Sequence, residues 1–293
     1  MTSQRAHFAL KGHSGAGLTL IEGAQPIVRK QATRLEQNAR LKDQCAKLQE
    51  AHKQGLSCPE IYKTGELEGL FFFDMEFIPG ETLAHAIISG RQLDWSRLLP
   101  QIRRQIDHFA ASETGIIAVE SFLLKIRNIL AACGANMVAA PYIARLGDQF
   151  ERLAALDWTS IPSSECHGDL TLENILIRSD GQLVFLDFDV PEQSSWQLDI
   201  GKMYQDLFGH WCLRSLALEQ VETFRMINAQ MALARADAAL APITDLVPGG
   251  RARFAQLAAF HLARTLPYAR DENIVRFVSQ RLGHILAIAR EGT

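Results

Sequence analysis

A carboxamide and a carboxylate stand at the open end of a predicted β-hairpin near the middle of the chain. Two apolar runs, Ile175–Ile177 and Leu183–Phe188, flank the turn residues Ser179-Asp180-Gly181. An Asp-Gly pair between such runs is typical of a two-residue type I′ hairpin loop. In that register Asn174 faces Asp187, and opposed side chains have Cβ atoms about 4.5–5.5 Å apart. Amide and carboxylate oxygens bind hard divalent cations, so the pattern predicts a metal held by Asn174 and Asp187.

The same register predicts an aliphatic opposite face for the hairpin. Ile175 would face Leu186, and Ile177 would face Val184. Because side chains alternate between the two faces of a strand, a shift of one residue would exchange these faces. The aliphatic pairs therefore support the predicted register.

Two spaced motifs surround this hairpin. His167-Gly168-Asp169 and Asn174 have the spacing H-x-D-x-x-x-x-N, and Asp187-Phe188-Asp189 follows the second strand. In phosphoryl transfer, the Asp of the first motif accepts the proton of the acceptor hydroxyl, and the Asn and the later Asp hold Mg²⁺. The set resembles the aminoglycoside phosphotransferase/choline kinase superfamily, which favours HGD over HRD and DFD over DFG.

The resemblance implies a fold and an activity. The expected fold class is α+β, a bilobal protein-kinase-like fold with a small antiparallel-β N-lobe (1–78), a larger mainly helical C-lobe (79–293) and nucleotide between them. The implied reaction moves the γ-phosphate of ATP, with GTP as an open alternative, to a hydroxyl of a small molecule. An amino sugar, a sugar, a choline-like alcohol or an aminoglycoside would fit. The cofactors would be ATP and Mg²⁺, and Asp169 would be the catalytic residue.

A glycine cluster and a lysine near the N-terminus are candidates for binding the nucleotide phosphates. Gly12, Gly15 and Gly17 lie between two short predicted strands, where they form either a phosphate cradle or a plain turn. A third strand ends in Arg29 and Lys30, and alternation allows only one of the two to point inward. We expect Lys30 to point inward, and the resemblance assigns that residue to the α- and β-phosphates.

A polar helix is predicted next, over residues 33–54. The family places a glutamate on this helix to pair with the strand lysine. The position that resembles it holds Gln44, which offers a hydrogen bond but no charge. Glu36, Asp43 and Glu50 are the alternatives in other registers.

The dipeptide Pro79-Gly80 follows a strand predicted over 69–75. A strand that breaks at Pro-Gly and restarts as a helix indicates a boundary between lobes. The resemblance assigns backbone groups near Glu76 and Ile78 to the adenine edge; a surface turn is the alternative.

Composition narrows the possible partners. The 293 residues include 47% hydrophobic and 22% charged residues, with a formal net charge of −3, so no strong field would attract nucleic acid or an anionic membrane. The chain begins without an apolar signal region, and its five cysteines are scattered, which favours reduced thiols in the cytoplasm. We therefore expect a small-molecule hydroxyl acceptor, no nucleic acid and no membrane; the sequence does not indicate the oligomeric state.

Two alternative functions remain besides a small-molecule kinase. A protein kinase is disfavoured because no A-P-E segment follows DFD. A catalytically silent nucleotide-binding scaffold is suggested by Gln44. Among the neighbouring residues, Asp199 is expected to support the catalytic loop and His167 to prop it, while Asp189 either bonds locally or reaches a second metal.

Overall fold

The computed structural model describes residues 7–10, 15–218, 223–247 and 249–290. The chain divides into two compact units: unit 1 contains Met1–Glu81 and Asn174–Glu192, and unit 2 contains Thr82–Glu173 and Gln193–Thr293. The hairpin predicted around residue 180 therefore belongs to unit 1. The functional lobes expected at 1–78 and 79–293 stay a prediction.

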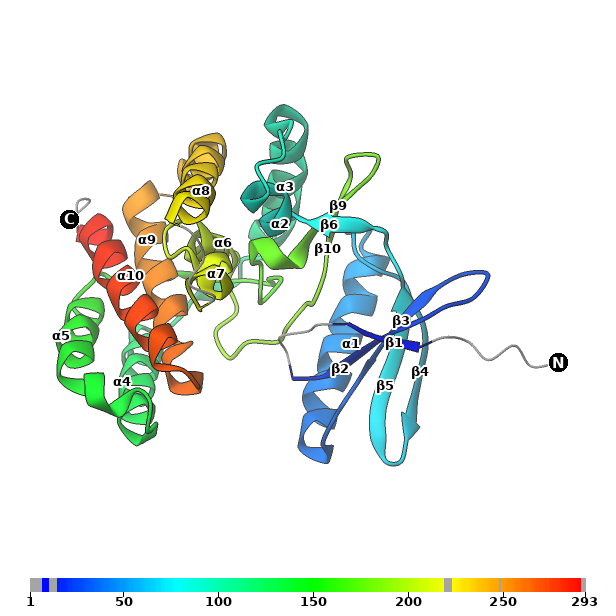
Figure 1. Cartoon of the computed structure of the whole chain (residues 1–293), viewed down its shortest axis with the longest axis horizontal. Coiled ribbons are helices and arrows are strands. Elements are labelled where there is room, and N and C mark those ends of the chain that lie inside the picture. Colours follow the sequence, from blue (N-terminus) through cyan, green and yellow to red (C-terminus); the bar gives the residue numbers. More distant parts are fainter. Residues whose placement is uncertain (1–6, 11–14, 219–222, 248, 291–293) are drawn as a thin grey trace. The chain divides into compact units, whose positions relative to one another are not determined.

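Unit 1 is an antiparallel sheet with one long helix beside it (Figure 1). The strands lie in the order β1-β2-β3-β5-β4. Their bounds are His7–Leu10 (β1), Gly17–Ile21 (β2), Ile27–Gln31 (β3), Ile61–Leu67 (β4) and Leu70–Glu76 (β5). A short 3₁₀ turn, η1 (Leu35–Gln37), leads into helix α1 (Asn38–Lys53), which packs on β4 and β5.

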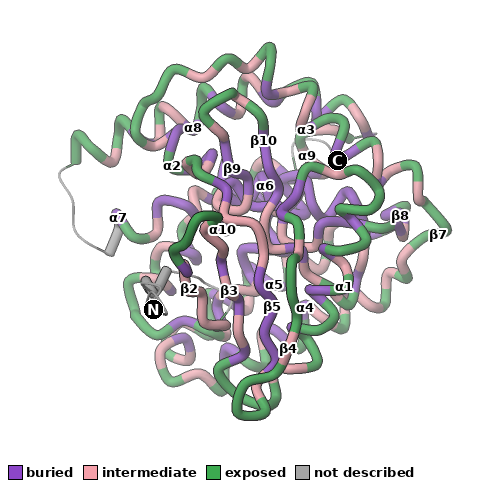
Figure 2. Tube along the Cα trace, turned by 90° about the vertical axis from the view of Figure 1, so that its right-hand side faces the viewer, coloured by how far each residue is buried: buried purple, intermediate pink, exposed green. Residues whose placement is uncertain are grey.

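Burial explains why these segments form where they do. Helix α1 buries Leu41, Cys45 and Leu48, which recur at the spacing of one helix face. The helix is shorter than the predicted range 33–54, and Gly55 follows it with φ +79°, the left-handed conformation common after helix ends. On the sheet, β5 is buried along most of its length (Figure 2).

The predicted hairpin register is wrong by one residue. Strands β9 (Ile175–Arg178) and β10 (Leu183–Phe185) pair Ile175 with Phe185 and Leu176 with Val184. The loop has three residues instead of two, because Arg178 pairs with Gln182 and only Gly181 has positive φ, at +78°. A turn that ends in one left-handed glycine is the usual three-residue hairpin loop. Asn174 and Asp187 are consequently not opposed in the ladder.

Strand β6 (Gly80–Thr82) joins the other edge of β9, so the small sheet has the order β10-β9-β6. A Cβ atom on Gly80 would lie 2.5 Å from the carbonyl oxygen of Ile177 and 2.7 Å from a methyl carbon of Leu176. Only glycine allows the backbone of β6 to approach β9 this closely. This close approach explains why the first residue of β6 is a glycine.

Unit 2 is mainly helical, with one two-stranded sheet formed by β7 (Gly115–Ile116) and β8 (Pro162–Ser163). Its first helices are α2 (Leu83–Ile88), α3 (Trp95–Ala110), α4 (Val119–Ala135), η2 (Ala140–Tyr142) and α5 (Ile143–Ala154). After η3 (Leu172–Asn174) and the hairpin come α6 (Trp196–Leu207), η4 (Trp211–Leu213), α7 (Arg214–Leu218), α8 (Thr223–Thr244), α9 (Gly250–Ala263), η5 (Leu266–Tyr268) and α10 (Glu272–Arg290).

The core of unit 2 lies where α6, α9 and α10 pack together. Almost every side chain of α6 and most of those of α9 are buried. A Cβ atom on Gly201 would lie 2.5 Å from the Cβ of Leu257, so the two helices meet at the distance that glycine allows. Helix α6 is therefore fixed firmly, and this matters because it carries the polar residues described below.

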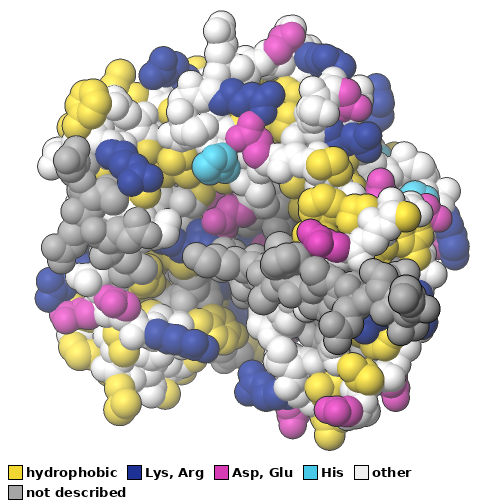
Figure 3. All heavy atoms as spheres, turned by 45° about the vertical axis from the view of Figure 1, so that its right-hand side comes forward, with side chains coloured by type: hydrophobic (Ala, Val, Ile, Leu, Met, Phe, Trp, Pro, Cys, Tyr) yellow, Lys and Arg dark blue, Asp and Glu magenta, His cyan; other side chains and the backbone are white. Residues whose placement is uncertain are grey.

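Two properties of the described residues are the hydropathy of the helices and the distribution of charged side chains. Among them, no single helix is long and apolar enough to cross a membrane; α4 and Ala140–Ala154 meet the criterion only as a pair bent by 119°. Acidic and basic side chains are interspersed over the face shown in Figure 3. The antiparallel sheet and the larger helical unit confirm the predicted α+β class.

Candidate active site

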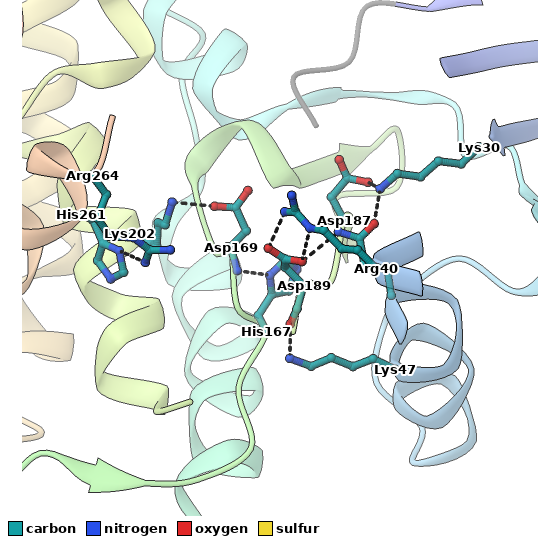
Figure 4. Close-up of polar contacts among 11 residues, drawn as sticks. Lys30, Arg40, Lys47, His167, Asp169, Asp187, Asp189, Lys202, His261 and Arg264 are labelled. Carbon is teal, nitrogen blue, oxygen red and sulfur yellow. Dashed lines mark hydrogen bonds and ion pairs between the residues drawn. The ribbon is translucent and has the colours of Figure 1, made fainter. Parts of the chain in front are cut away.

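Lys30 is a buried cation at the centre of unit 1. Its side chain is 2% exposed, and its Nζ donates to Oε1 of Gln44 at 3.1 Å and to Oδ1 of Asp187 at 2.9 Å (Figure 4). A buried ammonium is costly unless it is paired and hydrogen-bonded. Asp187 supplies the negative charge, and Gln44 supplies a second acceptor.

Arg29, the neighbouring cation, lies on the other face of β3, where it pairs with Asp74. Its guanidinium makes two hydrogen bonds with Asp74, at 2.7 and 2.8 Å, and lies 4.0 Å from the centre of the Phe72 ring. The hydrogen bond with Asp74 raises the pKa of Arg29. The alternation expected along β3 therefore separates a structural arginine from an inward lysine.

Asn174 and Asp187 lie at the same end of the hairpin. The carbonyl oxygen of Asn174 accepts the N–H of Leu186 at 2.8 Å, and Asp187 follows directly with φ +58°. This left-handed backbone is uncommon outside glycine, and aspartate is among the residues that tolerate it best. It takes Asp187 out of the strand, so its side chain does not follow the strand alternation on which the prediction relied.

The donor set suits Mg²⁺ bound together with a nucleotide. Among the described residues, no group of three or more His, Cys, Asp and Glu side chains could hold a metal alone. Mg²⁺ typically binds through one or two carboxylates plus substrate phosphates. The oxygens of Asn174 and Asp187 fit that pattern, and their role as metal ligands stays a prediction.

Asp189 is bound by α1. Its carboxylate accepts hydrogen bonds from Arg40, at 3.2 and 2.8 Å, and from Nε2 of Gln44 at 2.9 Å, while Lys47 donates to its backbone carbonyl (Figure 4). Burial acts to raise the pKa of Asp189, but the hydrogen bonds from Arg40 and Gln44 outweigh it and leave the pKa below its usual value. These contacts join Asp189 to a helix that is distant in sequence, and the two roles left open for it, a local bond and a second metal, stay predictions.

In unit 2, one face of α6 holds the loop that contains Asp169. Asp199 accepts the backbone N–H groups of His167 and Gly168, the latter at 2.7 Å. Lys202 lies one turn further along α6, and its Nζ is 2.9 Å from Oδ1 of Asp169. Residues 199, 202 and 206 are spaced three and four apart, so they share one helix face.

The third member of this face is Asp206. Its Oδ2 accepts the N–H of Leu172 at 2.8 Å. Burial raises the pKa of Asp206 to about 7, and the negative charge of Glu173 adds to the effect. Glu173 is itself paired with Arg214 at 3.0 Å. The loop from His167 to Leu172 is thus held by one polar stripe on a largely buried helix.

The expected roles of Asp199 and His167 fit this geometry. Asp199 is a structural support, as predicted. His167 is fully buried, and its Nδ1 accepts the N–H of Asp169 at 3.2 Å, which suits a prop for the loop. The proton-accepting role of Asp169 stays a prediction.

A comparison with protein families decides the identity of the chain. The model of the phosphotransferase enzyme family matches residues 18–243. The chain belongs to the phosphotransferase enzyme family. No curated protein shows a significant sequence match.

Solved structures of low sequence identity share the fold of this phosphotransferase. APH(2")-IIia, solved as a complex with GDP and kanamycin, is 14% identical with a TM-score of 0.60, and the match covers 98% of this chain and 94% of that one. A putative fructosamine-3-kinase from Haemophilus somnus is 14% identical with a TM-score of 0.56, over 96% and 92%. The choline kinase LicA from Streptococcus pneumoniae is 13% identical with a TM-score of 0.54, over 96% and 93%. These likenesses confirm the predicted kinase-like fold class.

The predicted nucleotide contacts of the phosphotransferase stay predictions. Gly12 lies outside the described residues. Gly15 has φ +76°, and its carbonyl accepts the Thr33 hydroxyl at 3.1 Å, whereas Gly17 is the first residue of β2. Glu76 is the last residue of β5.

Ile78 follows β5 and belongs to a small apolar cluster. The cluster contains Leu176 and Val184 from the hairpin, with the partly buried Leu186 packed against it. The corrected register explains this cluster, because it turns Leu176, Val184 and Leu186 to one face of the hairpin. The cluster is thus the aliphatic face of the small sheet in unit 1.

Sequence reasoning missed Lys202, Asp206 and the contacts of Asp189 with α1. A signal for the first two exists in the sequence. The helix 196–207 is mostly apolar, and Asp199 was already expected to support the loop; charged residues three and seven positions later share its face. No comparable local pattern indicates the contacts of Asp189.

Proposed function

We propose that this phosphotransferase uses ATP and moves its γ-phosphate to a hydroxyl group of a small molecule. The observation that carries the proposal is the 2.9 Å contact between Lys30 and Asp187. In phosphoryl transfer the corresponding lysine binds the nucleotide phosphates and the corresponding aspartate binds Mg²⁺. The direct contact supports a shared phosphate and metal site for these two residues.

Each residue of the proposed site has a defined task. Asp169 accepts the proton of the attacking hydroxyl while the bond between the β-γ bridging oxygen and the γ-phosphorus breaks. Lys30 binds the α- and β-phosphates, with the backbone of Gly15 and Gly17 beside them. Asn174 and Asp187 hold Mg²⁺, which when bound neutralises phosphate charge.

The support for Asp169 is the way α6 holds its loop. A general base contributes about 10²–10⁴-fold, provided that it is positioned against the reacting hydroxyl. Asp199 fixes the loop backbone through two N–H groups, and Lys202 contacts the Asp169 carboxylate directly. Preorganised geometry of this kind is what in-line phosphoryl transfer requires.

The adenine base is proposed to lie against the apolar cluster around Ile78. Backbone groups near Glu76 and Ile78 would hydrogen-bond its edge, and Leu176, Val184 and Leu186 would offer an apolar surface. Nucleotide sites commonly combine an apolar wall with a few fixed polar groups. GTP stays an alternative donor, since the related APH(2")-IIia was solved with GDP.

For the acceptor we propose an amino sugar, a sugar, a choline-like alcohol or an aminoglycoside. The solved relatives include a choline kinase, a putative fructosamine-3-kinase and a complex with kanamycin. We place the protein in the cytoplasm, because none of its five cysteines, all of which are described, forms a disulfide.

The experiment follows ADP release from ATP and Mg²⁺ in the presence of a panel of small alcohols, sugars and aminoglycosides. We expect one acceptor class to raise ADP release above background, and Asp169→Asn to abolish that increase while nucleotide binding is retained. Nucleotide binding without turnover on any acceptor would instead favour the scaffold, which the neutral Gln44 suggests. Turnover only with a protein substrate would favour the protein kinase.

A further inference from the structure

The side chain of Gln44 joins two charged groups of unit 1. Its Oε1 accepts from Nζ of Lys30 at 3.1 Å, and its Nε2 donates to Oδ1 of Asp189 at 2.9 Å. An ammonium can only donate, and an ionised carboxylate can only accept. The orientation of the amide is therefore fixed by its two partners, and both of its ends are used.

Asp189, which accepts from Gln44, is held in place by one face of α1. Arg40, Gln44 and Lys47 are spaced four and three apart, so they lie on the same side of the helix. Arg40 and Gln44 bind the Asp189 carboxylate, and Lys47 binds its backbone carbonyl. Both carboxylate oxygens of Asp189 contact α1, so the carboxylate is fixed against this helix.

This arrangement disfavours a glutamate at position 44. The carboxylate of a glutamate would still accept from Lys30, but its second oxygen would face the Asp189 carboxylate without a proton between them. Two ionised carboxylates at hydrogen-bond distance repel each other strongly in a partly buried setting. Only a group that accepts at one end and donates at the other satisfies both neighbours.

We propose that Asp189 is a positioning residue that acts through Gln44 on Lys30, so that the Gln44–Asp189 pair replaces the single helix glutamate expected for this family. In this pair the carboxylate belongs to Asp189, which reaches Lys30 only through the Gln44 amide, while Asp187 contacts Lys30 directly. This inference rests on the proposed function, because it concerns how Lys30 is aimed at nucleotide phosphates.

The test exchanges the amide and the carboxylate between positions 44 and 189. In Gln44→Glu, two carboxylates meet, and we expect the Kd for a non-hydrolysable ATP analogue with Mg²⁺ to rise about ten- to hundredfold. Asp189→Asn alone keeps an acceptor for Gln44, so we expect it to raise the same Kd only about threefold. In the double variant, the new amide at position 189 donates to the new carboxylate at position 44, and the Kd returns to within about threefold of the unmodified protein.

Two controls separate positioning from general damage. Adenosine lacks phosphates, so its Kd should stay within about twofold in every variant, whereas a disordered unit 1 would weaken adenosine binding as well. Gln49→Glu introduces the same substitution at an exposed position of α1 and should leave both Kd values unchanged. If Gln44→Glu does not fold, Gln44→Met removes both hydrogen bonds without a new charge and should also weaken the ATP analogue selectively.

The outcomes are distinct. The proposal is overturned if Gln44→Glu binds the ATP analogue as tightly as the unmodified protein, or if Asp189→Asn fails to restore binding in the Gln44→Glu background. If the unmodified protein binds neither the analogue nor adenosine, the proposed function has failed and the positioning role fails with it. If it binds nucleotide but shows no turnover, only the catalytic part of the proposed function fails, and the comparison of Kd values still decides the role of the pair.

Discussion

Asp206 should make the protein less stable as the pH rises from 4 to 8, and Asp206→Asn should remove this effect. The carboxyl group is fully buried on α6, where it accepts the N–H of Leu172. Its pKa is raised from 3.8 to about 7, chiefly by burial. An asparagine has nearly the same shape, keeps an acceptor for Leu172 and does not ionise.

The sign and the size follow from the two pKa values. Between pH 4 and 7 the folded state keeps the Asp206 proton, while the unfolded state has lost it, so a rising pH favours unfolding. Each pH unit in that window changes the free energy of unfolding by about 1.4 kcal/mol. As the pH rises from 4 to 8, the free energy of unfolding of Asp206→Asn should therefore increase by about 4 kcal/mol relative to that of the unmodified protein.

The assay is urea denaturation of both proteins at whole pH units from 4 to 8. Other titrating groups affect both proteins equally, so the difference between the two unfolding free energies isolates Asp206. Asp43→Asn, at an exposed position of α1, serves as the matched control and should give a difference that does not change with pH. Parallel curves for Asp206→Asn and the unmodified protein would refute the reasoning, since they would mean that Asp206 ionises equally in both states.

Three further outcomes are expected. Lys202→Met should lower kcat about ten- to hundredfold through loss of the contact with Asp169, with partial recovery in Lys202→Arg; equal kcat values would show that the ion pair is incidental. Asp199→Asn should reduce the free energy of unfolding by about 2–3 kcal/mol, because one loop N–H loses its acceptor, as urea denaturation will measure. Gly80→Ala should lower the free energy of unfolding by about 1–3 kcal/mol, because its methyl group meets a carbonyl of β9. Gly147→Ala, where a Cβ has open space, should raise that free energy by about 0.5–1 kcal/mol. Thermal unfolding of both variants tests the contrast.

Strand alternation and motif spacing were predictable from the sequence because both depend on short-range patterns. Period-two alternation along the strand predicted that only one of Arg29 and Lys30 points inward, and the family resemblance favoured Lys30. The loop that contains Asp169 was located by the spacing of Asp169 and Asn174, and its support by Asp199 was expected from the family resemblance. The helix predicted over 33–54 is present as the shorter α1, Asn38–Lys53, for the same reason.

The hairpin register was not predictable, because Ser179-Asp180-Gly181 fits a loop of two or three residues. Only the backbone shows that Gly181 alone is left-handed, and that single difference moves every facing pair by one. The contacts of Asp189 with α1 could not be predicted from the sequence for another reason. They join residues that are far apart in sequence, and no local pattern specifies which side chains such a contact unites.

The discontinuity of unit 1 has a consequence for dividing the protein into fragments. A polypeptide that stops at residue 81 lacks Asn174–Glu192, and with it the carboxylate that neutralises Lys30 and the strands that cover Ile78. Such a fragment would carry an uncompensated internal ammonium and an uncovered aliphatic patch, so it should be insoluble when produced alone. A synthetic peptide of residues 174–192, added in trans, carries the groups required to rescue it.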